Sequence, residues 1–334
     1  STLVVIEAIS IAMNSRFHRF IYQWPLTHYV LGIAILLFLT AFYSIAGAFN
    51  PGSAPWYFDS DREFQGMVLM LITMPAYIAI CYVKGTRRSR EIAASVDEAN
   101  GTELADTVIN YPIRLSLTFG FVGFLYAVLF NIPSFGLNFL SVDNTEKATI
   151  IGQVMVWTIM GVFLPVRCRI AYAFNRASQS VPIDIFEPGN LRPFAQIGLV
   201  DVLIISGALV ISTVQSLDFA FRPDNYSKAL VIALPAIFYL AIYPMWRLHQ
   251  RMVNIRQVQL EELNIRIKAA SKDIDIDHIN QLEILLQRRE RVLAVSTWPV
   301  DITIVQRFLL YIVIPPLAWI GAALVELMID GFIG

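Results

Sequence analysis

The sequence predicts an all-α fold: a membrane bundle of about seven transmembrane helices, three hairpins plus a last helix, with a cytoplasmic helical hairpin. Composition is the first reason, because 56% of the 334 residues are hydrophobic and only 15% are charged. A soluble domain carries about 25% charged residues. The chain therefore has too few charges to cover a water-facing surface of its size, and its net charge of −1 gives no basic field for nucleic acid.

The second reason is a series of long apolar runs, since a helix needs about 20 apolar residues to cross the hydrocarbon core of a bilayer. Seven runs meet this length: 28–49, 65–84, 113–133, 148–167, 194–216, 227–246 and 304–329. Prolines inside or beside these runs predict kinks, because a proline removes a backbone hydrogen bond. They are Pro75, Pro165, Pro235, Pro244 and the pair Pro315–Pro316.

Lysine and arginine orient these runs, because cytoplasmic loops carry an excess of both residues. With the N-terminus inside, the outer segments hold only 4 of the 25 basic residues: Arg62, Lys147, Arg222 and Lys228. Moving the topology by one helix would place the basic segments 84–90 or 166–169 outside. We therefore expect a cytoplasmic N-terminus and a C-terminus on the outer side.

The same pattern divides the chain into four parts. Residues 1–24 are expected to form an interfacial amphipathic helix on the cytoplasmic face, with Trp24 at headgroup depth. Residues 25–246 hold six spans, 247–300 form a cytoplasmic helical hairpin, and 301–334 hold the seventh span. The six spans form three hairpins whose return helices begin alike, which fits either a threefold repeat or convergence of ordinary helix ends.

The hairpin is predicted from two apolar stripes at helical spacing. Leu260, Leu263 and Ile267 form one stripe, and Leu282, Leu285, Leu286 and Val292 form the other. The charged segment 271–277 between them continues neither pattern. Such a hairpin is an interaction or oligomerisation element, or it packs against its own membrane domain; the sequence leaves both open.

Charges inside spans are the best functional signals in a membrane chain, because burying one in hydrocarbon costs at least about 2.5 kcal/mol. His28, Arg114, Asp201 and Arg307 lie within two turns of the cytoplasmic start of their spans. We expect Arg114 or Arg307 to pair with Asp201. The four form either a charged constriction at the inner mouth of a pathway or a structural ion pair with a snorkelling arginine.

Further polar positions are candidates for the same pathway. Asn131 lies deeper in the third span, and Glu326 lies near the outer end of the seventh. The outer face carries nine acidic residues against four basic ones, which would concentrate cations. Helix capping explains several of them as well: Ser60 and Glu63 make a capping box, and Asp143 and Asp224 stand where N-caps belong.

Small residues predict where helices approach closely. They are Gly120, Gly123, Gly152, Gly161 and the run Gly321-Ala322-Ala323. Catalytic signatures are missing from the sequence: there is no GxSxG, HExxH, phosphate-binding GxxxxGK[ST] or GxGxxG motif. The 4 histidines lie outside the span centres, and Cys81 and Cys168 are expected as free thiols. We therefore expect no cofactor and no metal site, and a lipid-modifying membrane enzyme is the least favoured of the functional hypotheses.

The segment RRERVLAVSTWPVDITIVQRFLLYIVIPPLAWIGAALVE (288–326) resembles the C-terminal region of a group of uncharacterised bacterial multipass membrane proteins. That group shares a Trp-Pro-x-Asp step, here Trp298 to Asp301, that leads into the last helix. The segment FEPGNLRPFAQIGL (186–199) is similar to the same group. Together the two segments cover about a sixth of the chain, and the resemblance implies a bacterial inner membrane, but no activity. Physically, Trp298-Pro299 is expected to end the cytoplasmic helix, and Asp301 to cap the seventh span.

Two functions remain open at this level. The first is a channel or transporter for a small ion or solute, with Asp201, Arg114, Arg307, Glu326 and Asn131 along its path. The second is a non-transporting scaffold or sensor subunit that recruits a partner through residues 247–297. Expected partners are membrane lipids, together with a second copy or another protein at this hairpin, and no nucleic acid.

Overall fold

The computed structural model describes residues 26–55, 58, 60–109, 113–131, 143–186, 188–216, 223–271, 276–300, 303–311, 313–314, 317 and 321. All regular structure in these residues is helical, which confirms the all-α prediction. The helices are α2 (Thr27–Ile45), α3 (Asp61–Asn100), α4 (Leu104–Ile109), α5 (Ile113–Asn131), α6 (Asn144–Ala177), α7 (Arg192–Ser212), α8 (Pro223–Ile242), α9 (Trp246–Ala270) and α10 (Ile276–Ala294). Short 3-10 turns lie at Pro188–Leu191, Thr213–Ser216 and Tyr243–Met245.

In the described part of the chain, five helices are long and apolar enough to cross a membrane: Thr27–Ile45, Asp61–Asn100, Asn144–Ala177, Gly189–Ser212 and Val231–Ala270. This is consistent with a membrane protein, but it does not support a count of seven. The apolar part of α5, Arg114–Leu129, is shorter than the other five. The expected seventh span, 304–329, is described only in part, and the expected interfacial helix 1–24 lies outside the described residues.

Two helices are much longer than a bilayer is thick. The 40 residues of α3 extend about 60 Å at 1.5 Å per residue, twice the ~30 Å hydrocarbon core. The helix continues through Pro75 and through the whole basic segment 84–90. Likewise, α6 has 34 residues and continues through Pro165 to Ala177. The basic segments predicted as connections are therefore extensions of the spanning helices.

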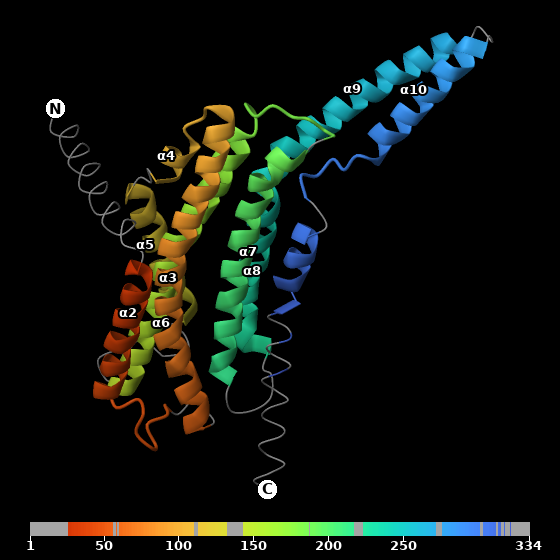
Figure 1. The fold of residues 1–334 in the computed structure, drawn as a ribbon. Coiled ribbons are helices and arrows are strands. Elements are labelled where there is room, and N and C mark those ends of the chain that lie inside the picture. The colour runs from red at the N-terminus through yellow and green to blue at the C-terminus, as the bar shows by residue number, and fades with distance from the viewer. Residues whose placement is uncertain are drawn as a thin grey trace, which may run out of the picture.

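The three expected hairpins are present as packed pairs: α2 lies along α3, α5 along α6, and α7 along α8 (Figure 1). The helix α3 also contacts α4, α6 and α7, so it lies at the centre of the bundle. Among the described residues, α5 and α6 share the most extensive helix–helix contact.

Glycines bring the helices close, as the sequence predicts. A Cβ added at Gly123 of α5 would lie 2.3 Å from the backbone oxygen of Trp157, and one added at Gly161 of α6 would lie 2.4 Å from that of Phe119. The backbones of α5 and α6 therefore touch. Gly321 is different, because no described atom lies within 4 Å of a Cβ built there.

The helix starts follow the capping predictions only in part. The Ser60 hydroxyl accepts a hydrogen bond from the Glu63 amide at 3.1 Å, as a capping box requires. Asp143 occupies the N-cap position of α6, but its side chain makes no capping hydrogen bond. The N-cap prediction for Asp224 is wrong, because α8 already begins at Pro223.

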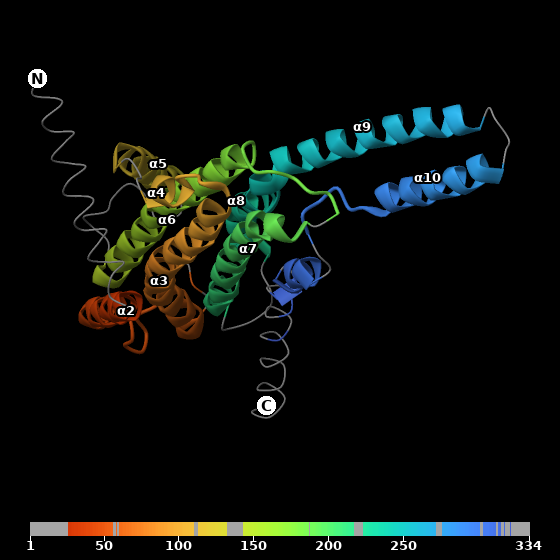
Figure 2. The same cartoon turned by 45° about the horizontal axis from the view of Figure 1, so that its top comes forward.

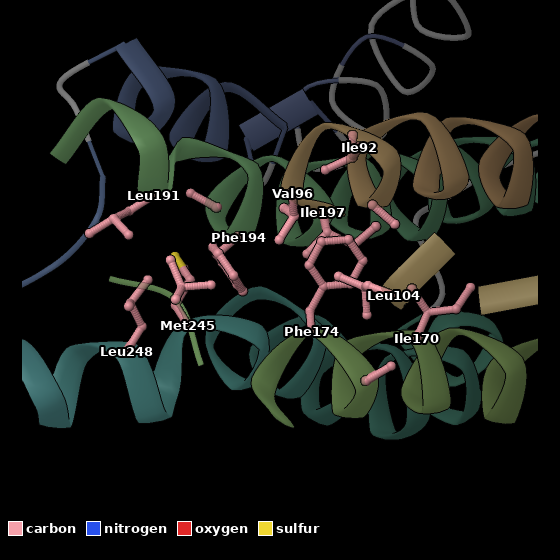
Figure 3. Close-up of a cluster of buried hydrophobic side chains, with 14 of the residues drawn as sticks. Ile92, Val96, Leu104, Ile170, Phe174, Leu191, Phe194, Ile197, Met245 and Leu248 are labelled. Carbon is pink, nitrogen blue, oxygen red and sulfur yellow. The ribbon is translucent and has the colours of Figure 1, made fainter. Parts of the chain in front are cut away.

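A large cluster of buried hydrophobic side chains lies at one end of the bundle (Figure 3). Most of its members come from α3, α4, α6 and α7 and from the first residues of α9, and the others are Val181, Leu191, Met245 and Ile304. Phe174 and Phe194 meet edge to face, with ring centroids 5.9 Å apart. Leu248 and Met252 bury the base of α9 in the same cluster, so the helix that leaves the bundle here starts from a packed core.

Beyond this base, α9 and α10 run antiparallel and project away from the bundle (Figures 1 and 2). The α-helix of α8 ends before Pro244, and a 3-10 turn at Tyr243–Met245 connects it directly to α9. The proline explains the change of direction, because its missing N–H cannot continue the α-helical hydrogen bonds. The hairpin therefore extends the sixth expected span, as the apolar stripes predict.

Because the α5–α6 backbones touch, we predict that Gly123→Ala destabilises the protein. The added methyl group must displace backbone atoms, and such overpacking costs about 1–3 kcal/mol. Thermal unfolding of the purified protein in detergent should show a midpoint lowered by several degrees. Gly189→Ala is the matched control, because no described atom lies within 4 Å of that position. Equal midpoints for the two variants would contradict the close approach.

Candidate functional site: a buried arginine–aspartate pair

Asp201, the first of the predicted site residues, lies on α7 and is completely buried. Its partner is Arg167 of α6, whose Nε donates a hydrogen bond to the Asp201 Oδ1. The two side chains are 1% and 0% exposed. A carboxylate and a guanidinium in such surroundings attract each other strongly, because little solvent screens them.

The helix α3 closes this pair from a third side. A Cβ added at Gly85 would lie 3.6 Å from Arg167 Nη1 and 2.9 Å from Ile204 Cδ1. Gly85 therefore leaves the space that the guanidinium and Ile204 occupy. About two turns earlier on α3, the Tyr77 hydroxyl donates a hydrogen bond to the Ile204 carbonyl at 2.8 Å, which connects α3 to α7 directly.

The pair leaves hydrogen-bonding capacity unused. Both Nη atoms of Arg167 and the Oδ2 of Asp201 are buried and have no hydrogen-bond partner among the described residues. The hydroxyl groups of Thr86 on α3 and Ser206 on α7 are also buried and have no hydrogen-bond partner among the described residues. Buried polar groups in proteins are nearly always hydrogen-bonded, so these unpartnered atoms are unusual for a buried interior.

The expected partners of Asp201 were wrong. Arg114 on α5 and Arg307 in the helical residues 303–311 are both exposed, and the buried partner is Arg167. The expected layer of four charges is therefore not assembled by the described residues. His28 is buried on α2, where its ring lies 4.0 Å from that of Tyr29. The side chain of Asn131 and all of Glu326 lie outside the described residues.

Arg167 was missed because it closes an apolar run and lies in the basic sequence VRCR (166–169), which resembles a cytoplasmic connection. A signal was nevertheless present. Ile170, Ala171 and Phe174 follow it at spacings of three, four and seven residues, and all three are buried. These spacings place Arg167 on the apolar face of a helix that continues, where an arginine needs a buried partner.

A second group of polar contacts lies where the hairpin leaves the bundle. Arg251 donates to the carbonyl oxygens of Ser178 at 2.5 Å and Val181 at 2.9 Å. The Arg247 amide donates to the Asn175 side chain at 3.1 Å. These bonds connect the first turns of α9 to the end of α6 and to the loop after it.

The segment that follows α10 is fixed at the same place. His249 stacks on Trp298 with ring centroids 4.1 Å apart and an interplanar angle of 14°. The His249 ring also hydrogen-bonds the Thr297 carbonyl through Nδ1 at 2.9 Å. Trp298 therefore contacts the base of α9, while α10 already ends at Ala294, before the Trp-Pro step expected to end it.

Metal-ligating residues do not gather in the described part of the chain, where no group of three or more His, Cys, Asp or Glu side chains occurs. Cys81 and Cys168 are both free thiols, as expected. No protein-family model, curated protein or solved structure matches this chain. The bacterial resemblance of residues 288–326 therefore stays a prediction.

We predict that the pair behaves as one unit in stability measurements. Arg167→Met or Asp201→Leu alone should lower the free energy of unfolding by about 3–5 kcal/mol, because each leaves one buried charge unpaired. The double variant should recover most of this loss, since apolar replacement of both partners of a buried pair is often neutral. Denaturant titration of the four proteins in detergent tests this, and a double variant no better than either single one would contradict it.

Proposed function

We propose that this chain is a membrane scaffold or sensor subunit that recruits a protein partner through the projecting α9–α10 hairpin. The observation that carries the proposal is an apolar stripe on α9 that nothing in the described structure covers. Val258 is 64% exposed and Ile265 is 69% exposed. They lie seven residues apart, so they share one face of the helix.

This stripe is not needed to hold the hairpin together. Leu263 and Val292 are the buried residues between the two helices. Arg256 donates to the Leu293 carbonyl at 2.6 Å, and Arg289 donates to the Asn264 side chain at 3.0 Å. Since these contacts already join α9 to α10, the exposed stripe is available for another helix.

On α10, Leu286 and Leu293 repeat the pattern, because they too are exposed and lie seven residues apart. Apolar residues at seven-residue spacing on an exposed helix are typical of surfaces that receive a partner helix. The 25 residues of α9 extend about 37 Å at 1.5 Å per residue. The hairpin therefore offers a long, narrow surface that suits a helical segment better than a small ligand.

The prediction is that a photo-crosslinking amino acid at position 258 or 265 captures one discrete partner in intact cells. The same amino acid at position 257 or 268 should capture much less, because Gln257 and Lys268 lie on the neighbouring polar stripe. Mass spectrometry of the adducts identifies the partner. The double variant Val258→Ser/Ile265→Ser should remove the association, and Gln257→Ser/Lys268→Ser should keep it.

Two outcomes would overturn this proposal. Equal crosslinking from both stripes would mean that the apolar face is not the binding surface. An adduct of two copies of this chain would make the hairpin an oligomerisation element without a recruited partner. Circular dichroism of both double variants checks that the helices remain folded.

Transport of a small ion or solute is the second candidate function. The observation that favours it is the buried Arg167–Asp201 pair with its neighbouring unpartnered polar atoms, since ionisable groups inside membrane segments mark ion and proton pathways. Burial of the pair and the exposure of Arg114 and Arg307 weigh against an open pathway. For this reason we place the recruiting function first.

If transport occurs, Asp201→Asn should change the conductance or ion selectivity of the protein reconstituted in a planar bilayer. The neutral amide keeps the shape of the side chain and removes the charge from the path. Glu91→Gln is the control, because Glu91 lies in an exposed ion pair with Arg88. Absence of current from the unaltered protein, or currents that Asp201→Asn leaves unchanged, would exclude this candidate.

A further inference from the structure

A cavity of about 1070 Å³ opens between α4, α5 and α6, and Ile232 of α8 also lines it. Its body is apolar and aromatic. Phe119 and Tyr126 of α5 and Trp157 of α6 line it, and the rings of Tyr126 and Trp157 are in contact, with centroids 4.6 Å apart. The touching backbones at Gly123 and Gly161 also line this cavity.

One end of the cavity has a different character. Arg169 and Arg176 of α6 line it there, together with Glu103 before α4. The uncharged polar residues at this end are Thr102, Thr107, Gln179 and Ser180. Among the described residues that line this end, two guanidinium groups and one carboxylate are the charged groups. The ligand that fits has a long apolar part and an anionic head.

The depth of the cavity agrees with this chemistry. From Trp157 to Cys168, α6 rises about 16 Å at 1.5 Å per residue. Half of a ~30 Å hydrocarbon core is about 15 Å. The apolar body therefore spans about one leaflet, and the arginines follow where lipid headgroups begin, on the side that the lysine and arginine distribution predicts as cytoplasmic.

We propose that this cavity is a binding site for one anionic phospholipid. Its acyl chains occupy the apolar body, and its headgroup phosphate accepts hydrogen bonds from Arg176, with the Arg169 guanidinium beside it. Guanidinium groups bind phosphate oxygens in a planar, bidentate geometry. Basic pockets between transmembrane helices on the cytoplasmic side are known to take such headgroups.

A helix of another protein is the competing occupant, and the lining favours the lipid. The charged residues gather at one end of the cavity, while residues from Leu115 to Leu164 are almost all apolar along the rest. A partner helix would need no such separation of a charged end from an apolar body. A phospholipid has that separation in its own covalent structure.

The test is native mass spectrometry of the full chain in detergent with added phosphatidylglycerol or phosphatidylcholine. We expect one retained phosphatidylglycerol at concentrations where phosphatidylcholine is not retained. Arg176→Gln should weaken retention about tenfold, the loss typical of one hydrogen bond to a charged group. Arg88→Gln removes the same charge from an exposed site paired with Glu91 and should leave retention unchanged.

A steric variant tests the apolar body separately. Val122 lines the cavity and is 53% exposed, while Leu129 is 67% exposed and does not line it. Val122→Trp should abolish retention, and Leu129→Trp should preserve it. Equal retention of both lipids, or retention that neither Arg176→Gln nor Val122→Trp reduces, would overturn the proposal. So would a crosslink from position 122 to a protein segment instead of lipid.

Discussion

The contact between Arg167 and Asp201 determines how the central helices lie, because it fixes α6 against α7 at a point where α3 closes over both. An unpaired charge in this interior would cost several kcal/mol, so the two helices cannot slide past each other without leaving Arg167 or Asp201 alone. The small size of Gly85 makes the arrangement possible, since any side chain there would meet Ile204 and approach the guanidinium. The positions of α8 and of the base of α9 follow from α7, against which both pack.

Between α5 and α6, the packing depends on small residues, as expected where apolar side chains gain little by leaving a lipid environment. The α5–α6 contact shows the consequence. Because Gly123 and Gly161 let the backbones touch, the larger side chains on either side of the contact form the walls of a cavity. The same residues that hold the two helices together thus create the space that we assign to a lipid. Larger residues at Gly123 and Gly161 would not fit at this distance between the two backbones.

The sequence was informative wherever one periodicity or one local rule decides the structure. Apolar runs located the helices, the stripes of Leu260–Ile267 and Leu282–Val292 located the hairpin, and Ser60 with Glu63 located one helix start. It was less informative about where helices end, because basic residues continue a helix as readily as they form a connection. That is how Arg167 was taken as the end of the fourth span and Asp201 was given the wrong partners. Pairing across 34 residues depends on which faces of α6 and α7 meet, and no local rule supplies this.

The hairpin is more than an appendage, because its base belongs to the bundle core. Leu248 and Met252 lie in the same cluster as Phe174 and Phe194, and Arg251 holds the loop after α6. The stacked His249–Trp298 pair then joins the segment after α10 to the first turns of α9. A hairpin fixed at its base in this way presents its apolar stripe at a set distance and direction from the bundle. That geometry suits a scaffold, since a partner helix bound to Val258 and Ile265 would be held in one orientation relative to α6 and α7.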